Sequence, residues 1–184
     1  MSDLSGGFTD PARTGARAFR AILDAMARPG RIVTVEGAHA PGLSPAAAGV
    51  ALTLCDPDVP VHLAGAADAA ADWIAFHCGA PPAAKAECAF AFGAWSALAP
   101  LAPYRIGTPE YPDRSATLVV ELEELSDDGL PLTGPGIDGT TFLSLPDPVA
   151  LRANAAQFPL GLDLIFTCGD RLACLPRSTR IGEV

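Results

Sequence analysis

Apolar residues follow a helical period near the start of the chain. Asp10 followed by Pro11 is a capping residue with proline at the first helical position, and Pro29-Gly30 ends the segment. Between these signals, four large apolar side chains recur at i, i+3, i+4 and i+7: Phe19, Ile22, Leu23 and Met26. The pattern predicts a helix that buries these four residues on one face.

Helix and strand signals alternate in the first half of the chain, whereas strand signals dominate the second half. Capping residues followed by proline, at Ser44-Pro45 and Asp147-Pro148, predict two further helix starts. We expect helices at residues 46–55, 66–78 and 148–157, with a helical turn at 95–98. We expect strands at residues 31–36, 59–63, 88–92, 115–122, 130–133 and 140–145, with Asp127-Asp128-Gly129 turning the fourth back into the fifth. This order predicts an α/β fold with a mixed sheet covered on both faces.

The last long apolar segment predicts a β-hairpin. Leu162–Cys168 is apolar and β-prone, Gly169-Asp170 suits a two-residue type II′ turn, and Arg171–Leu175 returns. The expected cross-strand pairs are Cys168 with Arg171, Thr167 with Leu172, Phe166 with Ala173, Ile165 with Cys174, and Leu164 with Leu175. Apolar residues then occupy both faces, so the hairpin should lie inside a covered sheet. Cys168 and Cys174 face opposite ways and should not form a disulfide.

Two charged residues lie at the open end of this hairpin. Asp163 interrupts an apolar run, so we expect it to accept hydrogen bonds or to pair with an arginine. Pro176 lacks the amide hydrogen that would continue a ladder, so the chain should leave the sheet there, with Arg177 at a strand end. Two alternatives stay open for Arg177: it faces a ligand cleft beyond the carboxyl ends of parallel strands, or it pairs with Asp163.

The composition indicates a globular protein with an acidic surface. The 184 residues carry a formal charge of −9, which argues against nucleic acid as a partner. No apolar run approaches the ~20 residues of a membrane span, no signal peptide is visible, and five cysteines are an odd number for a disulfide framework. We therefore expect a cytoplasmic protein with no membrane contact, formed by a single domain over residues 1–184 with residues 1–8 flexible.

Residues that could carry chemistry form no recognised catalytic or metal-binding motif. The sequence contains no Cys-x-x-Cys, no His-Glu-x-x-His and no nucleophile elbow, so neither a metal site nor a catalytic triad is expected. His77 is either an acid–base group or a residue that suits a helix end. Gly134-Pro135-Gly136 is either an anion-binding nest or, as we favour, a tight turn between strands. Eleven of the twelve basic residues are arginines; codon usage in a GC-rich genome accounts for this bias, although arginine also suits phosphate and phosphonate.

Five segments, in order along the chain, resemble the PhnH family of the bacterial carbon–phosphorus lyase system. They are residues 19–26 with Pro29-Gly30, 76–81, 116–120, 132–137 and the terminal segment 158–180. The resemblance covers most of the chain and implies a three-layer α/β/α arrangement similar to the pyridoxal-phosphate-dependent transferase fold. The only lysine, Lys85, follows Pro81-Pro82 in a predicted surface loop, so we expect no Schiff base, no pyridoxal phosphate and no other cofactor.

The resemblance implies a role in phosphonate catabolism, within the complex that forms ribose 1-methylphosphonate 5-triphosphate from ATP and phosphonate. It also implies a homodimer that associates with the PhnG, PhnI and PhnJ subunits. Because no catalytic constellation is present, we favour a non-catalytic, structural or substrate-positioning subunit. The alternative is a cofactor-independent enzyme that binds nucleotide or phosphonate through its arginines.

These two hypotheses predict different surfaces. An arginine-lined cleft would favour the enzyme, whereas a wide apolar face with arginines at its rim would favour the structural subunit. The candidates for phosphate or partner binding are Arg20, His77, Arg171 and Arg177, with Asp163 in a structural role.

Overall fold

A computed structural model describes residues 4–36 and 38–183 of the chain. The α-helices in these ranges are α1 (Pro11–Ala27), α2 (Pro45–Leu54), α3 (Ala71–Cys78), α4 (Trp95–Leu98) and α5 (Pro148–Ala155). The side chains of Asp10, Ser44 and Asp147 accept backbone hydrogen bonds at the starts of α1, α2 and α5, as predicted. Among the helices described, none has both the length and the apolar character that a membrane span requires.

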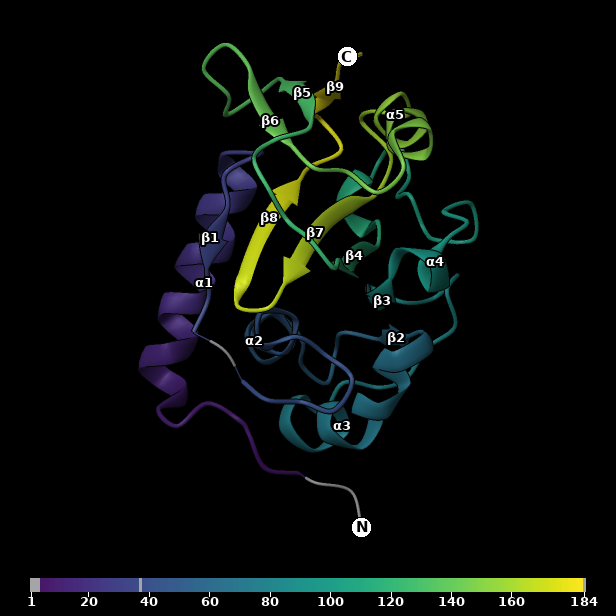
Figure 1. The fold of residues 1–184 in the computed structure, drawn as a ribbon. Helices are drawn as coiled ribbons and strands as arrows, with labels where there is room; N and C mark the ends of the chain where they lie inside the picture. The colour runs from purple at the N-terminus through teal and green to yellow at the C-terminus, as the bar shows by residue number, and fades with distance from the viewer. Residues whose placement is uncertain (1–3, 37, 184) are drawn as a thin grey trace.

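A six-stranded mixed sheet forms the centre of the molecule, in the order β1-β8-β7-β4-β3-β2 (Figure 1). Its strands are β1 (Val33–Thr34), β2 (Val61–Leu63), β3 (Phe90–Ala94), β4 (Thr117–Glu121), β7 (Asp163–Cys168) and β8 (Arg171–Leu175). The strands β2, β3, β4 and β7 run parallel, whereas β8 is antiparallel to both of its neighbours. A second, antiparallel sheet contains β5 (Leu130–Thr133), β6 (Thr141–Leu143) and β9 (Arg180–Ile181).

Both faces of the six-stranded sheet are covered. On one face, Ile165 and Val119 pack in a core with buried residues of α1, α2 and α3. On the other face, Leu164 and Phe166 pack in a core with α4, α5 and the small sheet. In Figure 1, α1 runs along the left edge and the small sheet lies at the top. The alternation of side chains across the strands therefore divides the interior into two cores.

The terminal hairpin is confirmed in every predicted pair, from Cys168 opposite Arg171 to Leu164 opposite Leu175. Because β7 and β8 each have a neighbour on their outer side, the hairpin lies inside the sheet. Cys174 belongs to the core beneath the helices α1–α3, and Cys168 packs against the opposite core. Their side chains thus point to opposite faces, as the turn residues predicted.

The prediction of the buried face of α1 is only half right. Ile22 is 4% exposed, but Phe19 is 49% exposed and Leu23 is 56% exposed. Ala18 and Ala25 are buried beside Ile22, because small side chains let α1 lie close against α2. Phe19 and Leu23 therefore face outward, although they are among the largest apolar residues of α1.

Other segments differ from their predictions in pairing or in length. The turn at Asp127-Asp128-Gly129 does not pair β4 with β5, since β4 already has β3 and β7 on its two sides. The predicted helix 66–78 is divided into a 3-10 segment, Gly65–Ala70, and α3, which ends at a left-handed Gly79 as predicted. The strand predicted at 31–36 is reduced to β1, an edge strand paired with β8 alone.

Candidate functional site

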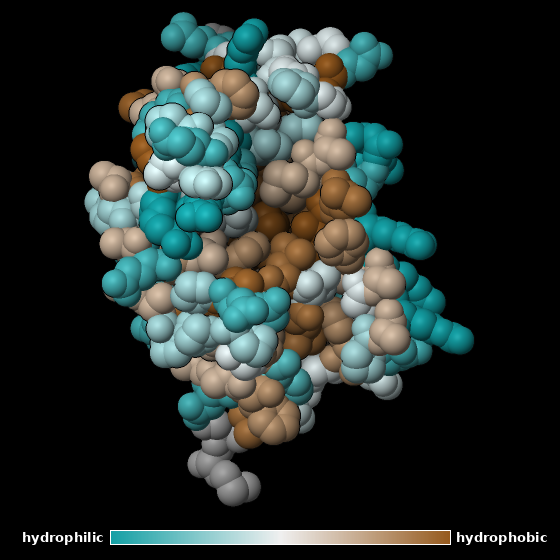
Figure 2. Space-filling view, turned by 180° about the vertical axis from the view of Figure 1, so that it is seen from behind, coloured by the Kyte–Doolittle hydropathy of each residue, from teal (hydrophilic) through white to brown (hydrophobic). Residues whose placement is uncertain are grey.

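The outward side of α1 carries a stripe of solvent-exposed apolar residues. Phe19 and Leu23 are four residues apart and so lie one above the other on the helix. Exposed alanines extend this side along the helix, and we name the whole set the apolar stripe: Ala12, Ala16, Phe19, Leu23 and Ala27. Figure 2 shows a wide, hollowed apolar area on the side turned away in Figure 1, reaching the edge formed by α1. An exposed apolar area of this kind indicates an interaction surface.

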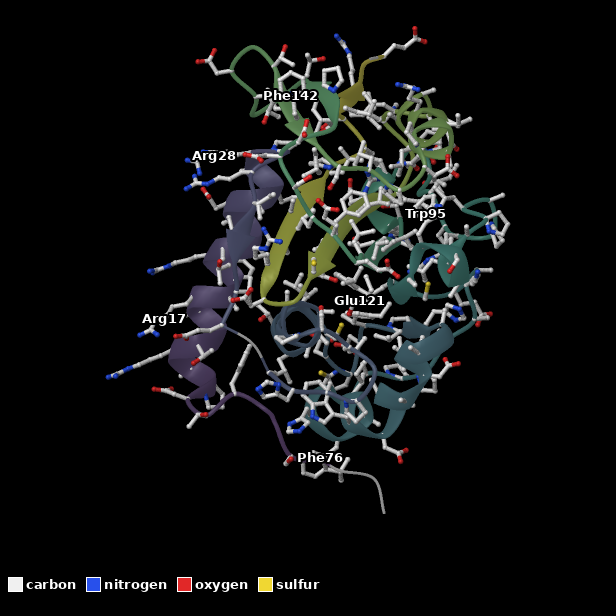
Figure 3. The ribbon with its side chains drawn as sticks, viewed as in Figure 1. Arg17, Arg28, Phe76, Trp95, Glu121 and Phe142 are labelled. Carbon is white, nitrogen blue, oxygen red and sulfur yellow. The ribbon has the colours of Figure 1, made fainter. Side chains whose placement is uncertain are left out.

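Exposed arginines lie along the adjacent side of α1. They are Arg13, Arg17, Arg20 and Arg28, and we name them the arginine row. Figure 3 shows Arg17 and Arg28 pointing away from the body of the molecule. Arg17 pairs with Glu36 at 3.2 Å and Arg28 pairs with Asp24, but both arginines are more than half exposed, and exposed pairs are weak. Within the described residues, Arg20 has no ion pair.

Arg177 and Asp163 form an ion pair at the amino-terminal ends of the parallel strands. The backbone N–H and the Nε of Arg177 donate to Asp163 Oδ1 at 2.9 and 3.1 Å, and Nη2 donates to Oδ2. The guanidinium also donates to Pro112 O at 2.6 Å and to Ser115 Oγ. The side chain of Arg177 is only 12% exposed. The structure therefore supports the second alternative for Arg177, pairing with Asp163.

The topology places Arg177 away from the end of the sheet where a ligand cleft is expected. Ligand clefts of α/β sheets lie beyond the carboxyl ends of parallel strands. Since β8 is antiparallel to β7, the residues that follow β8 lie where β7 begins, at the opposite end. Arg177 therefore acts first as a structural residue that connects β7 to the segment around Ser115.

The remaining candidate residues lie apart from one another. His77 is in the last turn of α3, and its ring lies against Trp73 in a tilted arrangement with ring centroids 4.5 Å apart. Its Nε2 lies 2.9 Å from Leu4 O. Trp73 donates to Ser5 O, so the two aromatic rings together hold the N-terminal segment. Arg171 is exposed at the start of β8, and Arg20 is exposed on α1. No single cleft of the described residues brings together Arg20, Arg171 and Arg177.

Glu121 is a polar residue at the sheet that the sequence did not single out. It ends β4 and is half-buried, at the centre of the view in Figure 3. Its Oε1 accepts the backbone N–H of Ser44 at 2.7 Å, and its Oε2 accepts Thr167 Oγ1 at 3.0 Å. The carboxylate thereby holds the start of α2 over the carboxyl ends of the strands. The dipole of α2 favours a negative charge at this end of the helix. The sequence did carry a signal for this residue, because a glutamate follows directly after the apolar run 118–120.

A mainly apolar cavity of about 720 Å³ opens between the segment after α4 and α5. Trp95, Tyr104 and Leu162 contribute apolar wall, and Asp147 and Asn154 are among its few polar residues. No arginine or lysine is among the described residues that line it. This lining differs from the arginine-lined cleft expected of an enzyme that binds nucleotide or phosphonate through its arginines.

Burial suppresses the reactivity of most of the thiols. All five cysteines are free. Burial raises the pKa of Cys78 to about 11, and it also raises the pKa values of Cys55, Cys88 and Cys174. Cys168 is only half-buried, at the hairpin turn.

These environments predict that one thiol of the native protein reacts rapidly. Because the thiolate is the nucleophile, a dithiobis-nitrobenzoate titration at pH 8 should label Cys168 first and the other four only after denaturation. Cys168→Ser should remove the fast phase and leave the slow phases unchanged. Rapid reaction of any thiol in native Cys168→Ser would contradict the buried environments.

Comparison with known proteins identifies the family. A family model described as "Bacterial phosphonate metabolism protein (PhnH)" matches residues 6–182. A protein of Rhizobium meliloti (strain 1021), named "Alpha-D-ribose 1-methylphosphonate 5-triphosphate synthase subunit PhnH", is 44% identical over 190 residues, which cover 96% of this chain and 94% of that protein. A protein of Stutzerimonas stutzeri, named "Putative C-P lyase subunit protein HtxG", is 32% identical over 175 residues, which cover 90% and 84%. The chain belongs to the PhnH family of bacterial phosphonate metabolism proteins.

Proposed function

We propose that this chain is a subunit of the carbon–phosphorus lyase system and serves phosphonate catabolism by binding other chains. Its relatives are named as subunits of ribose 1-methylphosphonate 5-triphosphate synthase and of a C-P lyase. The observation that carries the proposal is the apolar stripe of α1 beside the arginine row, the surface expected of a structural subunit. The chain thereby supports formation of the ribose 1-methylphosphonate 5-triphosphate without supplying a catalytic group.

The partner that suits this surface is a different chain with acidic residues around an apolar patch. A two-fold contact between identical copies through α1 would bring the arginine row of one copy toward that of the other. Like charges would then repel, whereas acidic residues of another subunit would complement the row. The proposed partners are the PhnG, PhnI and PhnJ subunits, in the cytoplasm. The proposed homodimer uses a different face.

The proposal includes a sheet like that of pyridoxal-phosphate-dependent transferases, without the cofactor. Lys85 is the only lysine, and its Nζ donates to Ala97 O at 3.1 Å and to Leu98 O at 2.8 Å. It lies in a turn between exposed residues, as predicted, but it is half-buried and near the ring of Tyr104. An amine held by two carbonyl groups and a ring does not fit the role of a Schiff-base lysine.

Removing the apolar stripe should abolish assembly without unfolding the chain. We expect the double variant Phe19→Ser, Leu23→Ser, co-expressed with the PhnG, PhnI and PhnJ subunits, to lose at least tenfold in recovered complex, since both residues are about half exposed in the isolated chain. Val149→Ser is the matched control, because Val149 is 76% exposed on α5. Light scattering should give the same dimer mass for the double variant and the unaltered chain. The proposal would be contradicted if the double variant assembled fully, or if Val149→Ser lost as much recovered complex. A monomer mass for the double variant would also contradict it.

A further inference from the structure

The apolar cavity of about 720 Å³ lies between α5 and the segment that follows α4, at the right of the molecule in Figure 1. On the α5 side, Ala150 and Ala153 line it with small side chains that leave the space open. On the other side lie Trp95, Pro100 and Leu101, which are not fully buried and so have surface to offer a ligand. A cavity of this size and lining is typical of a small-molecule binding site.

Hydrogen bonds within the protein hold the two sides of this cavity in place. The buried side chain of Asn154 on α5 donates from Nδ2 to Leu162 O and accepts the Leu162 N–H through Oδ1, both at 2.8 Å. The hydroxyl of Tyr104 donates to Leu98 O at 3.1 Å and so attaches the segment after α4 to that helix. The cavity is therefore formed before a ligand arrives, and binding does not have to order its walls.

The charge of the lining decides which class of small molecule the cavity suits. Asp147 is the only charged residue among the described residues that line it. Asp147 Oδ1 accepts the backbone N–H of Ala150 at 3.0 Å, whereas no described residue donates to Oδ2 or forms an ion pair with this carboxylate. Gln157 lines the cavity just beyond the carboxyl end of α5, where the helix dipole places partial negative charge.

The positive charge nearest to this lining is already bound elsewhere. Lys85 Nζ lies 5.4 Å from the ring centroid of Tyr104, but Lys85 is not among the described lining residues, and its amine donates to the carbonyl groups of Ala97 and Leu98. An anion in the cavity would meet the Asp147 carboxylate and no cation that could pair with it. The lining therefore disfavours carboxylates, phosphates and phosphonates and favours a positive group.

We propose that this cavity binds a small organic cation of the arylalkylamine class, in which an ammonium group is joined to an apolar ring. The ammonium group donates to the carboxylate of Asp147, as a charge-assisted hydrogen bond. The ring occupies the apolar space beside Ala150 and Ala153, and Trp95 adds an aromatic surface that suits a cation. This ligand differs from the ATP and phosphonate of the proposed function, and the site does not depend on the docking role of α1.

Three probes that share one indole ring test the class of ligand: tryptamine, a cation; indole, which is neutral; and indole-3-acetate, an anion. We expect calorimetry and saturation-transfer NMR to show saturable binding of tryptamine, at least tenfold tighter than that of indole. Indole-3-acetate should not saturate the protein at millimolar concentrations, and ATP should not displace tryptamine. Absence of saturation by tryptamine, equal affinity for indole or for indole-3-acetate, or displacement by ATP would overturn the proposal.

Asp147→Asn tests the carboxylate without removing the helix cap, since asparagine caps helices as well as aspartate does. This variant should keep its melting temperature and its affinity for indole but bind tryptamine at least tenfold more weakly. Asp127→Asn is the matched control, because it removes an exposed carboxylate from a turn outside the cavity. Unchanged tryptamine affinity in Asp147→Asn, or an equal loss in Asp127→Asn, would overturn the role of the carboxylate and with it the proposal.

Ala150→Leu tests the location by filling the cavity, and it should abolish binding of both indole and tryptamine. Val149→Leu is its control, because Val149 is the neighbouring residue on α5, is 76% exposed and does not line the cavity. Retained binding in Ala150→Leu, or an equal loss in Val149→Leu, would place the ligand elsewhere and overturn the site. If Ala150→Leu lowers the melting temperature, Asp147→Asn decides the outcome, because it retains the cap of α5.

Discussion

Arg177→Ala is expected to lower the free energy of unfolding by about 3–5 kcal/mol, the usual cost of removing one partner of a buried ion pair. The substitution leaves the Asp163 carboxylate, 24% exposed at the start of β7, without its cation. It also removes the donors to Pro112 O and Ser115 Oγ, which connect the segment before β4 to the end of β8. Denaturant unfolding monitored by circular dichroism measures the change.

A double-mutant cycle tests whether the loss comes from the pair itself. Asp163→Ala alone should destabilise the protein, and the double variant Arg177→Ala, Asp163→Ala should lose clearly less than the sum of the single variants. Arg171→Ala is the control, because Arg171 is exposed on the same hairpin and should change stability by less than about 0.5 kcal/mol. Arg177→Ala with the stability of the unaltered protein would contradict the structural role.

Gly136→Ala is expected to destabilise the protein by about 2–5 kcal/mol, combining backbone strain with a steric clash. Gly136 has φ +81°, a conformation that residues with a Cβ rarely adopt. A Cβ at this position would overlap the carbonyl oxygen of Ala27, where the turn between β5 and β6 lies against the end of α1. Since a Cβ is fixed rigidly to its own backbone and would meet a backbone oxygen, neither side can move away by a change of rotamer.

Gly139→Ala separates the two causes. Gly139 lies in the same connection with φ +74°, but a Cβ there would meet no atom within 4 Å. Gly139→Ala should therefore destabilise the protein by the backbone strain alone, about 1–2 kcal/mol. Thermal and denaturant unfolding of the two variants side by side gives the difference. Equal destabilisation by both variants would mean that the contact with Ala27 contributes nothing.

The sequence by itself determined the features of this protein that depend on neighbouring residues. Asp10, Ser44 and Asp147 predicted their helix starts, because capping is a hydrogen bond to an amide three residues away. Gly169-Asp170 predicted the register of the terminal hairpin, because a two-residue turn leaves one pairing for the strands that it joins. The motifs of the family resemblance predicted the PhnH family, to which the chain belongs. Asp163 was correctly expected to pair with an arginine, since a carboxylate in an apolar strand requires a partner.

Only the tertiary structure decided which surfaces those elements bury. Phe19 and Leu23 looked like core residues by spacing, yet packing against α2 selected the alanine side of α1 and left them exposed. The parallel pairing of β4 on both sides excluded the hairpin expected at Asp127-Asp128-Gly129. The antiparallel direction of β8 brought Arg177 to the amino ends of the strands. The physical reason is common to all three: burial and strand neighbours are set by contacts between residues far apart in the chain, which local spacing does not encode.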